Sequence, residues 1–282
     1  LHPYSATSVA ERARGDNGAF LHTAGWNRLG LIFADGVSKQ EDLLISTLET
    51  ILEGVPIFGG SAGDGLQFEQ TFVLCNGKAH KNAAVLLLIE TDLAFEGLGF
   101  DHFQPVGNPL VITAADPDAR VVYEINGSPA AVEYARLVGC DVDQLSPEVF
   151  AANPLLLEHH QRHYARAISD AAPDHALSFL AAIDDGLVLK LGRGTEVIDT
   201  LRNGLDFSDA HDGRPDFVLG FDCVLRLLEF QQKKLSAVVS ETLAAARVFG
   251  FNTYGEQHVG LHMNHTFVGV AFYPPGRGTE LQ

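Results

Sequence analysis

Apolar runs and one amphipathic stretch open the patterned part of the chain. Residues 29–36 and 55–60 are apolar runs of strand length, which is typical of buried strands. Between them, residues 38–54 carry apolar side chains at helical spacing, with Ser38 as the expected cap and Gly54 as the expected stop. The pattern therefore predicts a strand, a helix and a second strand in this order.

Hairpin signals dominate the next stretch. Residues 71–90 predict two strands around an Asn76-Gly77 turn, and the second continues into residues 93–104. The glycine-rich segment at 59–65 lacks the lysine of a phosphate-binding loop and the spacing of a dinucleotide fingerprint. It predicts either a tight turn or a turn that lines a ligand cavity, because glycine allows close backbone approach.

The middle and end of the chain repeat this mixture of strands and short helices. Residues 216–224 predict a strand that runs into one long helix, in which Leu228, Leu235 and Val239 face a sheet and Arg226 and Glu229 are exposed. The other expected elements are strands at 110–115 and 120–125 with a turn at Asn126-Gly127, a helix at 128–139, a strand pair at 175–183 and 186–192, a helix at 196–202, and closing strands at 247–256 and 265–273.

Hairpins outnumber crossover helices after residue 70, so the fold class expected is mixed α/β (α+β). We expect largely antiparallel sheets covered by helices, in two subdomains that meet near residues 105–109.

Charge and composition exclude several classes of protein. The chain of 282 residues carries a formal net charge of −17, which disfavours nucleic acid and basic membrane docking. No apolar run approaches the ~20 residues of a membrane helix. The first residues are polar, unlike a signal peptide. The three cysteines have no metal-type spacing, so we expect reduced thiols in a cytoplasmic protein.

Histidine is abundant, with 12 residues, and two clusters have alternative interpretations. If residues 155–168 are helical, His159 and His163 share a face beside His160, as a zinc pair or as a solvated face. If residues 256–267 are extended, His258 and His262 point to one face and His265 to the other. That group needs a further ligand before it holds a metal.

Two single residues have a distinctive context. His102 lies between Phe100 and Phe103, and an imidazole in an aromatic wall suits a single axial bond to a haem iron, although a packed histidine fits as well. Cys223 lies at a strand-to-helix junction beside Asp222, where a catalytic thiol would also need a nearby histidine. A buried inert cysteine is the alternative there.

Several segments resemble the FIST domain family in the order in which that family carries them. GLIFADG and VPIFGGSAGDGLQFEQTFVLCNG resemble the later part of a FIST N-terminal domain. VVYEINGSPAAVEYARLVG, AAIDDGLVLKLGRG, FDCVLRLLEFQQ and FGFNTYGEQ resemble the FIST C-terminal domain. The resemblance implies an N-terminal domain over 1–105, truncated at its start since the chain begins with Leu1, and a C-terminal domain over 106–282. It also implies a bacterial sensory module that binds a small ligand and is not an enzyme.

The second half is similar to the NosP subgroup, through LSPEVFAANPLLL, RHYARAI and AIDDGLVL. This resemblance implies haem b, nitric oxide as the gaseous ligand, and a partner histidine kinase that acts on cyclic-di-GMP signalling. His102 then becomes the expected axial ligand, with His262 as second choice. Arg162, Arg166 and Arg226 are the expected cationic partners of the haem propionates.

Two other functions stay open from the sequence. A haem-free FIST sensor would bind an amino acid or similar small metabolite, with Arg226, Glu229, Tyr254 and Glu256 as polar anchors. A cysteine-dependent hydrolase would use Cys223.

Overall fold

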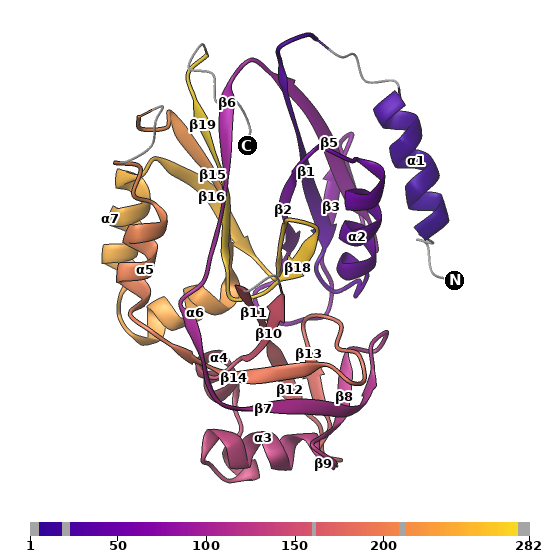
Figure 1. Cartoon of the computed structure of the whole chain (residues 1–282), viewed down its shortest axis with the longest axis vertical. Helices are drawn as coiled ribbons and strands as arrows, with labels where there is room; N and C mark the ends of the chain where they lie inside the picture. Colours follow the sequence, from indigo (N-terminus) through magenta and orange to yellow (C-terminus); the bar gives the residue numbers. More distant parts are fainter. Residues whose placement is uncertain (1–5, 19–22, 160–161, 209–212, 276–282) are drawn as a thin grey trace. The chain divides into compact units, whose positions relative to one another are not determined.

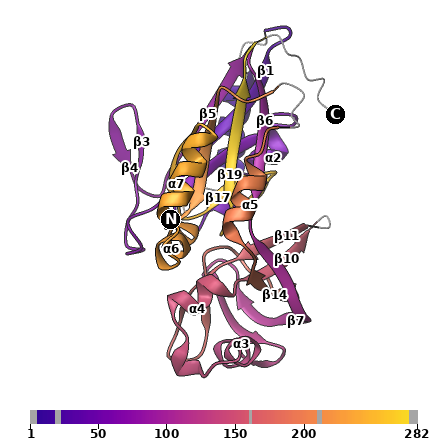
Figure 2. The same cartoon turned by 90° about the vertical axis from the view of Figure 1, so that its left-hand side faces the viewer.

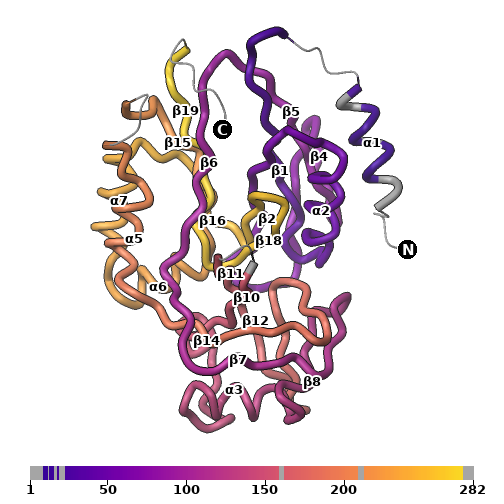
Figure 3. Tube along the Cα trace, in the orientation of Figure 1, coloured from indigo at the N-terminus to yellow at the C-terminus, as the bar shows by residue number. Residues whose placement is uncertain are grey.

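The computed structural model describes residues 6–18, 23–159, 162–208 and 213–275 (Figure 1). They divide into two compact units, which are described separately. Unit 1 draws on both ends of the chain, over 1–100, 201–262 and 266–282, and unit 2 comprises 101–200 and 263–265. The Cα trace in Figure 3 shows the chain leaving unit 1 after β6 and returning to it at α5. The units are therefore interleaved in sequence.

The first sheet of unit 1 contains the predicted strand, helix and strand. Helix α2 joins β1 to β2, which pair in parallel, and β5 pairs antiparallel with β1. Residues Ile45, Leu48 and Leu52 are buried in a cluster with side chains of β1 and β2, as the helical spacing predicts. The sheet order is β18-β17-β2-β1-β5, with β1 at Asn27–Asp35, α2 at Glu41–Ile51, β2 at Ile57–Ala62, β5 at Ala84–Thr91, β17 at Glu256–His258 and β18 at Leu261–Met263, and α1 (Ala6–Gly18) contacts α2.

In the second sheet of unit 1, helices again join two strands that pair in parallel, β15 and β16. Strand β15 pairs in parallel with β16 and antiparallel with β19, and β19 pairs with β6. The strands are β15 (Phe217–Cys223), β16 (Val248–Thr253), β19 (Phe267–Tyr273) and β6 (Ala94–Phe100), and the helices are α5 (Val197–Gly204), α6 (Val224–Gln232) and α7 (Ser236–Ala245).

The connection between β15 and β16 corrects the prediction of one long helix. The helix breaks after Gln232, where Lys234 adopts a left-handed φ of 57°, and α7 begins at Ser236. Val239 is buried as predicted, whereas Leu228 and Leu235 are only half-buried. The break rotates α7 away from the face that a continuous helix would present.

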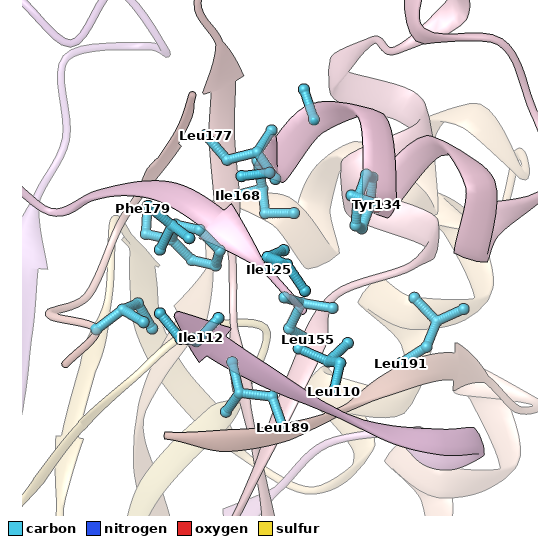
Figure 4. Close-up of a cluster of buried hydrophobic side chains, with 14 of the residues drawn as sticks. Leu110, Ile112, Ile125, Tyr134, Leu155, Ile168, Leu177, Phe179, Leu189 and Leu191 are labelled. Atoms are coloured by element: carbon cyan, nitrogen blue, oxygen red, sulfur yellow. The ribbon is translucent and has the colours of Figure 1, made fainter. Parts of the chain in front are cut away.

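Unit 2 is built on one sheet with two helices packed on it. Tyr134 of α3 and Phe150 of α4 join a core with side chains from β7, β8, β10, β13 and β14 (Figure 4). The sheet order is β11-β10-β14-β7-β8-β13-β12 with β9 beside β8, and the elements are β7 (Phe103–Asp116), β8 (Val121–Ile125), β9 (Ser128–Pro129), α3 (Ala130–Val138), η1 (Val142–Gln144), α4 (Pro147–Ala152), β10 (Leu155–His159), β11 (Arg162–Arg166), β12 (Ile168–Ala171), β13 (Leu177–Phe179) and β14 (Val188–Gly194).

Local predictions in unit 2 are confirmed in part. The Asn126-Gly127 turn is present, with both residues at positive φ, and Gly139 ends α3. The segment expected as a helix around His159 and His163 is instead a hairpin of β10 and β11, and His160 lies outside the described residues. The strands expected to pair at 175–183 and 186–192 do not pair, because β13 lies beside β8 and β14 beside β7.

The remaining elements of unit 1 form a small separate hairpin of β3 (Val73–Cys75) and β4 (Lys78–His80), with the predicted Asn76-Gly77 turn (Figure 2). The helix expected from Ser38 begins later, at Glu41, and Gln40 is its cap residue. The fold is thus the expected mixed α+β class with several sheets, largely antiparallel apart from the β1–β2 and β15–β16 pairs. Within the described part of the chain, no helix is both long and apolar enough to cross a membrane.

Candidate functional site

The carboxyl ends of β15 and β16 bring polar side chains together in unit 1. The two strands pair in parallel through Asp222↔Asn252 and Cys223↔Thr253, and α6 begins directly after Cys223. In sheets with parallel strands, ligands commonly bind at the carboxyl ends of the strands. The residues gathered there are Asp222, Arg226, Thr253, Glu256 and Thr266, here called the Arg226 cluster.

Arg226 is the central cation of the cluster and has no exposed surface. Its Nε donates a hydrogen bond of 2.6 Å to Asp222 Oδ1, and its guanidinium lies over the rings of Phe230 and Phe100. Its Nη1 and Nη2 atoms are buried and have no hydrogen-bond partner among the described residues. The prediction that Arg226 is exposed is therefore wrong, because the side chain folds back from the first turn of α6 onto Asp222.

Glu256 is the second acidic group of the cluster and is fully buried. Its carboxyl accepts hydrogen bonds of 2.6 Å from the hydroxyls of Thr253 and Thr266. Burial raises the pKa of Glu256 to about 8, and the nearby Asp222 carboxylate acts in the same direction, while the threonine hydrogen bonds oppose the shift. At neutral pH, Glu256 is therefore mainly uncharged, and Asp222 is the acidic partner that the described structure pairs with Arg226.

This arrangement favours an anion as the missing partner of Arg226. A buried guanidinium that lacks hydrogen bonds on two nitrogens is costly, by roughly 1–3 kcal/mol for each unsatisfied group. Two adjacent Nη groups match the two oxygens of a carboxylate or phosphate. The aromatic faces of Phe100 and Phe230 hold the guanidinium plane on its other sides.

A second group of hydrogen-bonded polar side chains starts at Gln257, the residue after Glu256 of the cluster. Gln257 Nε2 donates to Ser61 Oγ at 2.9 Å and lies 3.1 Å from His262 Nδ1. All three residues are buried. His262 thus packs into the polar interior where β2 and β17 pair, and its Nδ1 side is turned to an amide rather than to an open cavity.

Tyr254 connects the same segment to the loop after β2. Its hydroxyl hydrogen-bonds to Asp64 and accepts from the Leu66 backbone N–H, and its ring stacks on Phe68 at 4.6 Å. Although burial acts against it, hydrogen bonds from Tyr254 and from backbone N–H groups lower the pKa of Asp64. Tyr254 therefore fixes the position of this loop. In the sequence it lies between Thr253 and Glu256 of the cluster.

The other residues expected at a haem site lie in unit 2. His102 is buried, with its ring 4.3 Å from that of Phe103 and its Nε2 3.3 Å from the position of a Cβ on Gly194. Arg166 is buried at the end of β11, and Arg162 is exposed at its start. Because these residues belong to another unit, they form no described arrangement with the Arg226 cluster.

His163, His258 and Cys223 each have their own surroundings in the described structure. His163 lies 3.7 Å from Glu158, and His258 stacks on Phe58 at 5.1 Å. The described residues contain no group of three or more His, Cys, Asp or Glu that could hold a metal. Cys223 is completely buried as the cap residue of α6, which fits the expected buried cysteine, and the three thiols are not disulfide-bonded.

Comparison with protein families assigns the chain. Residues 3–128 match the FIST N domain and residues 130–258 match the FIST C domain. The chain is a FIST-domain protein. These domains indicate a sensory or signalling role.

Comparison with individual proteins adds one relative of unknown activity. The chain is 23% identical over 280 residues to an uncharacterized protein of Methanocaldococcus jannaschii. The match covers 87% of this chain and 54% of that protein. This FIST chain thus spans about half the length of the relative. No solved structure matches this chain.

Sequence reasoning identified part of the Arg226 cluster. Arg226, Tyr254 and Glu256 were candidates, but Thr253 and Thr266 were not, and Glu229 instead pairs with Lys233 on α6. From the sequence, Asp222 is singled out only as the neighbour of Cys223, not as a site residue. The spacing of Asp222 and Arg226, four residues apart across a strand-to-helix junction, was the available signal for their ion pair.

Proposed function

We propose that this FIST protein is a sensory module that binds a small metabolite bearing a carboxylate, such as an amino acid, with Arg226 as the anchor. The observation that carries the proposal is the pair of buried Arg226 Nη atoms without a partner among the described residues. A carboxylate would supply two acceptors to these atoms in one plane.

The neutral state of Glu256 supports an anionic ligand. An ionised Glu256 would add a second negative charge near Asp222, and the two charges would repel an anion that approaches Arg226. A protonated Glu256 leaves room for the charge of the ligand and can donate a hydrogen bond. The pKa shift of Glu256 therefore couples ligand affinity to pH, with weaker binding above about pH 8.

The closed state of the cluster fits a sensor. Nη1 and Nη2 of Arg226 are shut off from solvent, so a ligand reaches them only when neighbouring side chains move. The ligand then stabilises the opened conformation, and this shift in population is the signal. The segment with Thr253 and Glu256 also contains Tyr254, so a movement there reaches the loop held by Asp64.

The experiment is a thermal-shift screen with the twenty amino acids, followed by calorimetry of the hits and of their carboxamides. We expect a ligand whose affinity falls at least about 100-fold when its carboxylate is converted to the amide, in line with the loss of a charge-assisted hydrogen bond. Arg226→Lys keeps the charge but loses the planar fork, and should bind weakly. A ligand that binds its amide and acid forms equally would overturn the proposal.

A second variant separates folding from binding. Arg226→Met alone leaves Asp222 buried without its cation, whereas Asp222→Leu with Arg226→Met removes both charges. We expect the double variant to fold and to bind no amino acid. Retained binding by a folded double variant would place the ligand elsewhere.

Haem binding with nitric-oxide sensing is a narrower hypothesis for the same sensory role, and it rests on the resemblance to NosP proteins. Its residues fit poorly in this conformation. Both ring nitrogens of His102 are buried, and the ring lies 4.3 Å from that of Phe103, so a macrocycle could reach Nε2 only after the surrounding side chains move. A carboxylate at Arg226 needs a far smaller opening than haem at His102.

An absorption spectrum tests the haem hypothesis directly. The protein is titrated with haem b beside His102→Ala and His262→Ala, and nitric oxide is then added to the reduced forms. A saturable Soret band lost in one histidine variant would support haem, and its absence from wild type would remove the hypothesis. Regulation of a histidine kinase and of cyclic-di-GMP signalling is proposed for either ligand. Its readout is kinase autophosphorylation with and without this protein and its ligand.

A further inference from the structure

The hairpin of β3 and β4 stands apart from the large sheets of unit 1. Its strands pair only with each other among the described strands, through Val73↔His80, Leu74↔Ala79 and Cys75↔Lys78. Figure 2 shows it projecting from the rest of the unit. A two-stranded ribbon alone is marginally stable in water, so its base must be fixed by other contacts.

The base is fixed by buried residues, whereas two apolar side chains in and next to β3 are exposed. Val73 is buried, and the Thr71 hydroxyl hydrogen-bonds to buried Asp35. Leu74, by contrast, is 76% exposed, and Phe72 is 45% exposed. Lys81 holds Phe72 in place, since its Nζ lies 5.1 Å from the ring centroid and donates to Gln70 Oε1 at 2.5 Å.

The charge of this segment is opposite to that of the chain. Residues 70–89 contain no aspartate or glutamate, although the whole chain has 36 acidic residues and a net charge of −17. The hairpin and its flank carry Lys78, His80 and Lys81, all exposed. An exposed leucine on a basic ribbon is the complement of an acidic surface with an apolar pocket.

We propose that the β3–β4 hairpin docks onto an acidic protein partner, with Leu74 in an apolar pocket and Lys78 and Lys81 facing carboxylates. This interface is independent of the ligand at Arg226. Its fixed base and short two-residue turn present Leu74 with little conformational entropy left to lose on binding.

Two other occupants fit the charges less well. A symmetric dimer through the hairpin would place lysines against lysines, and a head-to-tail contact between copies would generate a ring or an open filament. An anionic membrane gains only about 1 kcal/mol from each lysine near its surface, while the net charge of −17 repels it. A distinct acidic protein avoids both problems.

The experiment uses a display library of random 20-residue peptides, sorted against the purified full chain in 50 mM salt. We expect enriched peptides with an excess of Asp and Glu around an aromatic or aliphatic anchor. Their affinity should fall at least 10-fold for Leu74→Glu and for Lys78→Glu with Lys81→Glu. Leu43→Glu, at an exposed leucine on α2, is the matched control and should bind like wild type.

Several results would overturn the docking proposal. Failure to enrich peptides, peptides without acidic excess, or equal binding to Leu74→Glu would each do so. Flotation of wild type but not Leu74→Glu with vesicles of phosphatidylcholine and 30% phosphatidylserine would assign the hairpin to membranes instead. Sedimentation velocity that shows a wild-type oligomer dissociated by Leu74→Glu would assign it to a second copy. Unchanged melting temperatures of the variants establish that the hairpin variants are folded.

Discussion

Two strand–helix–strand segments of unit 1 are built alike and differ in the partners of one aspartate. In the first segment β1 and β2 pair in parallel around α2, and in the second β15 and β16 pair in parallel around α6 and α7. Each first strand ends in a buried aspartate, Asp35 as the last residue of β1 and Asp222 as the next to last of β15.

The surroundings of the two aspartates are different in kind. Asp35 accepts hydrogen bonds from the backbone N–H groups of Val37 and Asn82 and from the Thr71 hydroxyl, so it ties three pieces of chain together. Asp222 instead holds the side chain of Arg226, whose remaining nitrogens have no partner in the described structure. The first aspartate joins separate backbone segments, and the second positions the cation that we propose as the ligand anchor.

The largest expected loss of stability concerns a feature that the two segments share, a glycine packed against the backbone of the paired strand. A Cβ on Gly59 of β2 would lie 1.9 Å from the Ile32 carbonyl oxygen, and one on Gly250 of β16 would lie 1.9 Å from that of Gly220. Both obstacles are backbone atoms of the paired strand and cannot turn aside. Gly59→Ala or Gly250→Ala should each cost more than about 5 kcal/mol of unfolding free energy.

Urea denaturation measures this loss. Gly15→Ala is the control, because a Cβ there meets no atom within 4 Å in helix α1 and should be neutral or slightly stabilising. If only Gly59→Ala unfolds the protein while Gly250→Ala is tolerated, the likeness of the two parallel pairs does not extend to their packing.

The next effect separates the two aspartates. Asp35→Ala should cost about 3–5 kcal/mol, because the buried Thr71 hydroxyl and two backbone N–H groups lose their acceptor. A second substitution, Thr71→Val, should not restore the loss, since the donors from Val37 and Asn82 belong to the backbone. In contrast, Asp222→Leu with Arg226→Met should lie within about 1 kcal/mol of wild type or above it, because both partners of the ion pair are removed.

Thermal and chemical denaturation of these three variants decides this point. The contrast is lost if Thr71→Val rescues Asp35→Ala, or if the Asp222 and Arg226 double variant is as unstable as Asp35→Ala. Either outcome would mean that the two aspartates have equivalent structural roles.

The sequence was most informative where one local pattern decides the structure. The β1–α2–β2 segment, the Asn76-Gly77 and Asn126-Gly127 turns and the strand at β15 were predicted because apolar spacing and turn residues act over a few neighbours. The break after α6 was not, since Lys234 adopts a left-handed φ without being glycine or asparagine. Pairing of β13 and β14 with distant strands depends on contacts that no local pattern contains.

The candidate site was predicted only at its charged residues. Arg226 and Glu256 stand out in a sequence, but their roles depend on burial and on Asp222, Thr253 and Thr266 from separate segments. Threonines that solvate a buried carboxyl look like ordinary strand residues. The expected exposure of Arg226 failed for the same reason, because helical spacing does not reveal that a cation folds back onto the preceding strand.

Glu256, which follows the second segment, should make the unfolding free energy depend on pH, with an effect smaller than those of the glycine and Asp35 substitutions above. Its folded-state pKa of about 8 lies above the ordinary glutamate pKa of 4.5, so the folded protein binds more protons than the unfolded chain between these values. The stabilisation it provides is complete below about pH 4.5 and is lost as the pH rises through 8. Glu256→Gln cannot ionise and should become progressively more stable than wild type over this range, by up to about 3 kcal/mol at pH 7.

Unfolding free energies of wild type and Glu256→Gln at pH 5, 7 and 9 measure the difference. Subtracting the two curves removes the titration of all other groups. A difference that does not change between pH 5 and 9 would show that Glu256 is ionised in the folded protein, and the charge argument for an anionic ligand would fail with it.

The smallest effect concerns the helices that connect the parallel strands. Helix α2 is continuous, whereas α6 and α7 are separated by exposed Lys234 at a φ of 57°. Glycine adopts this conformation without strain, so Lys234→Gly should raise the unfolding free energy by up to about 1 kcal/mol. In one continuous helix, as the apolar spacing alone predicts, the same substitution would lower it by about 1 kcal/mol. Its sign in urea denaturation, with exposed Lys233→Gly as the neighbouring control, therefore distinguishes a broken connection from an unbroken one.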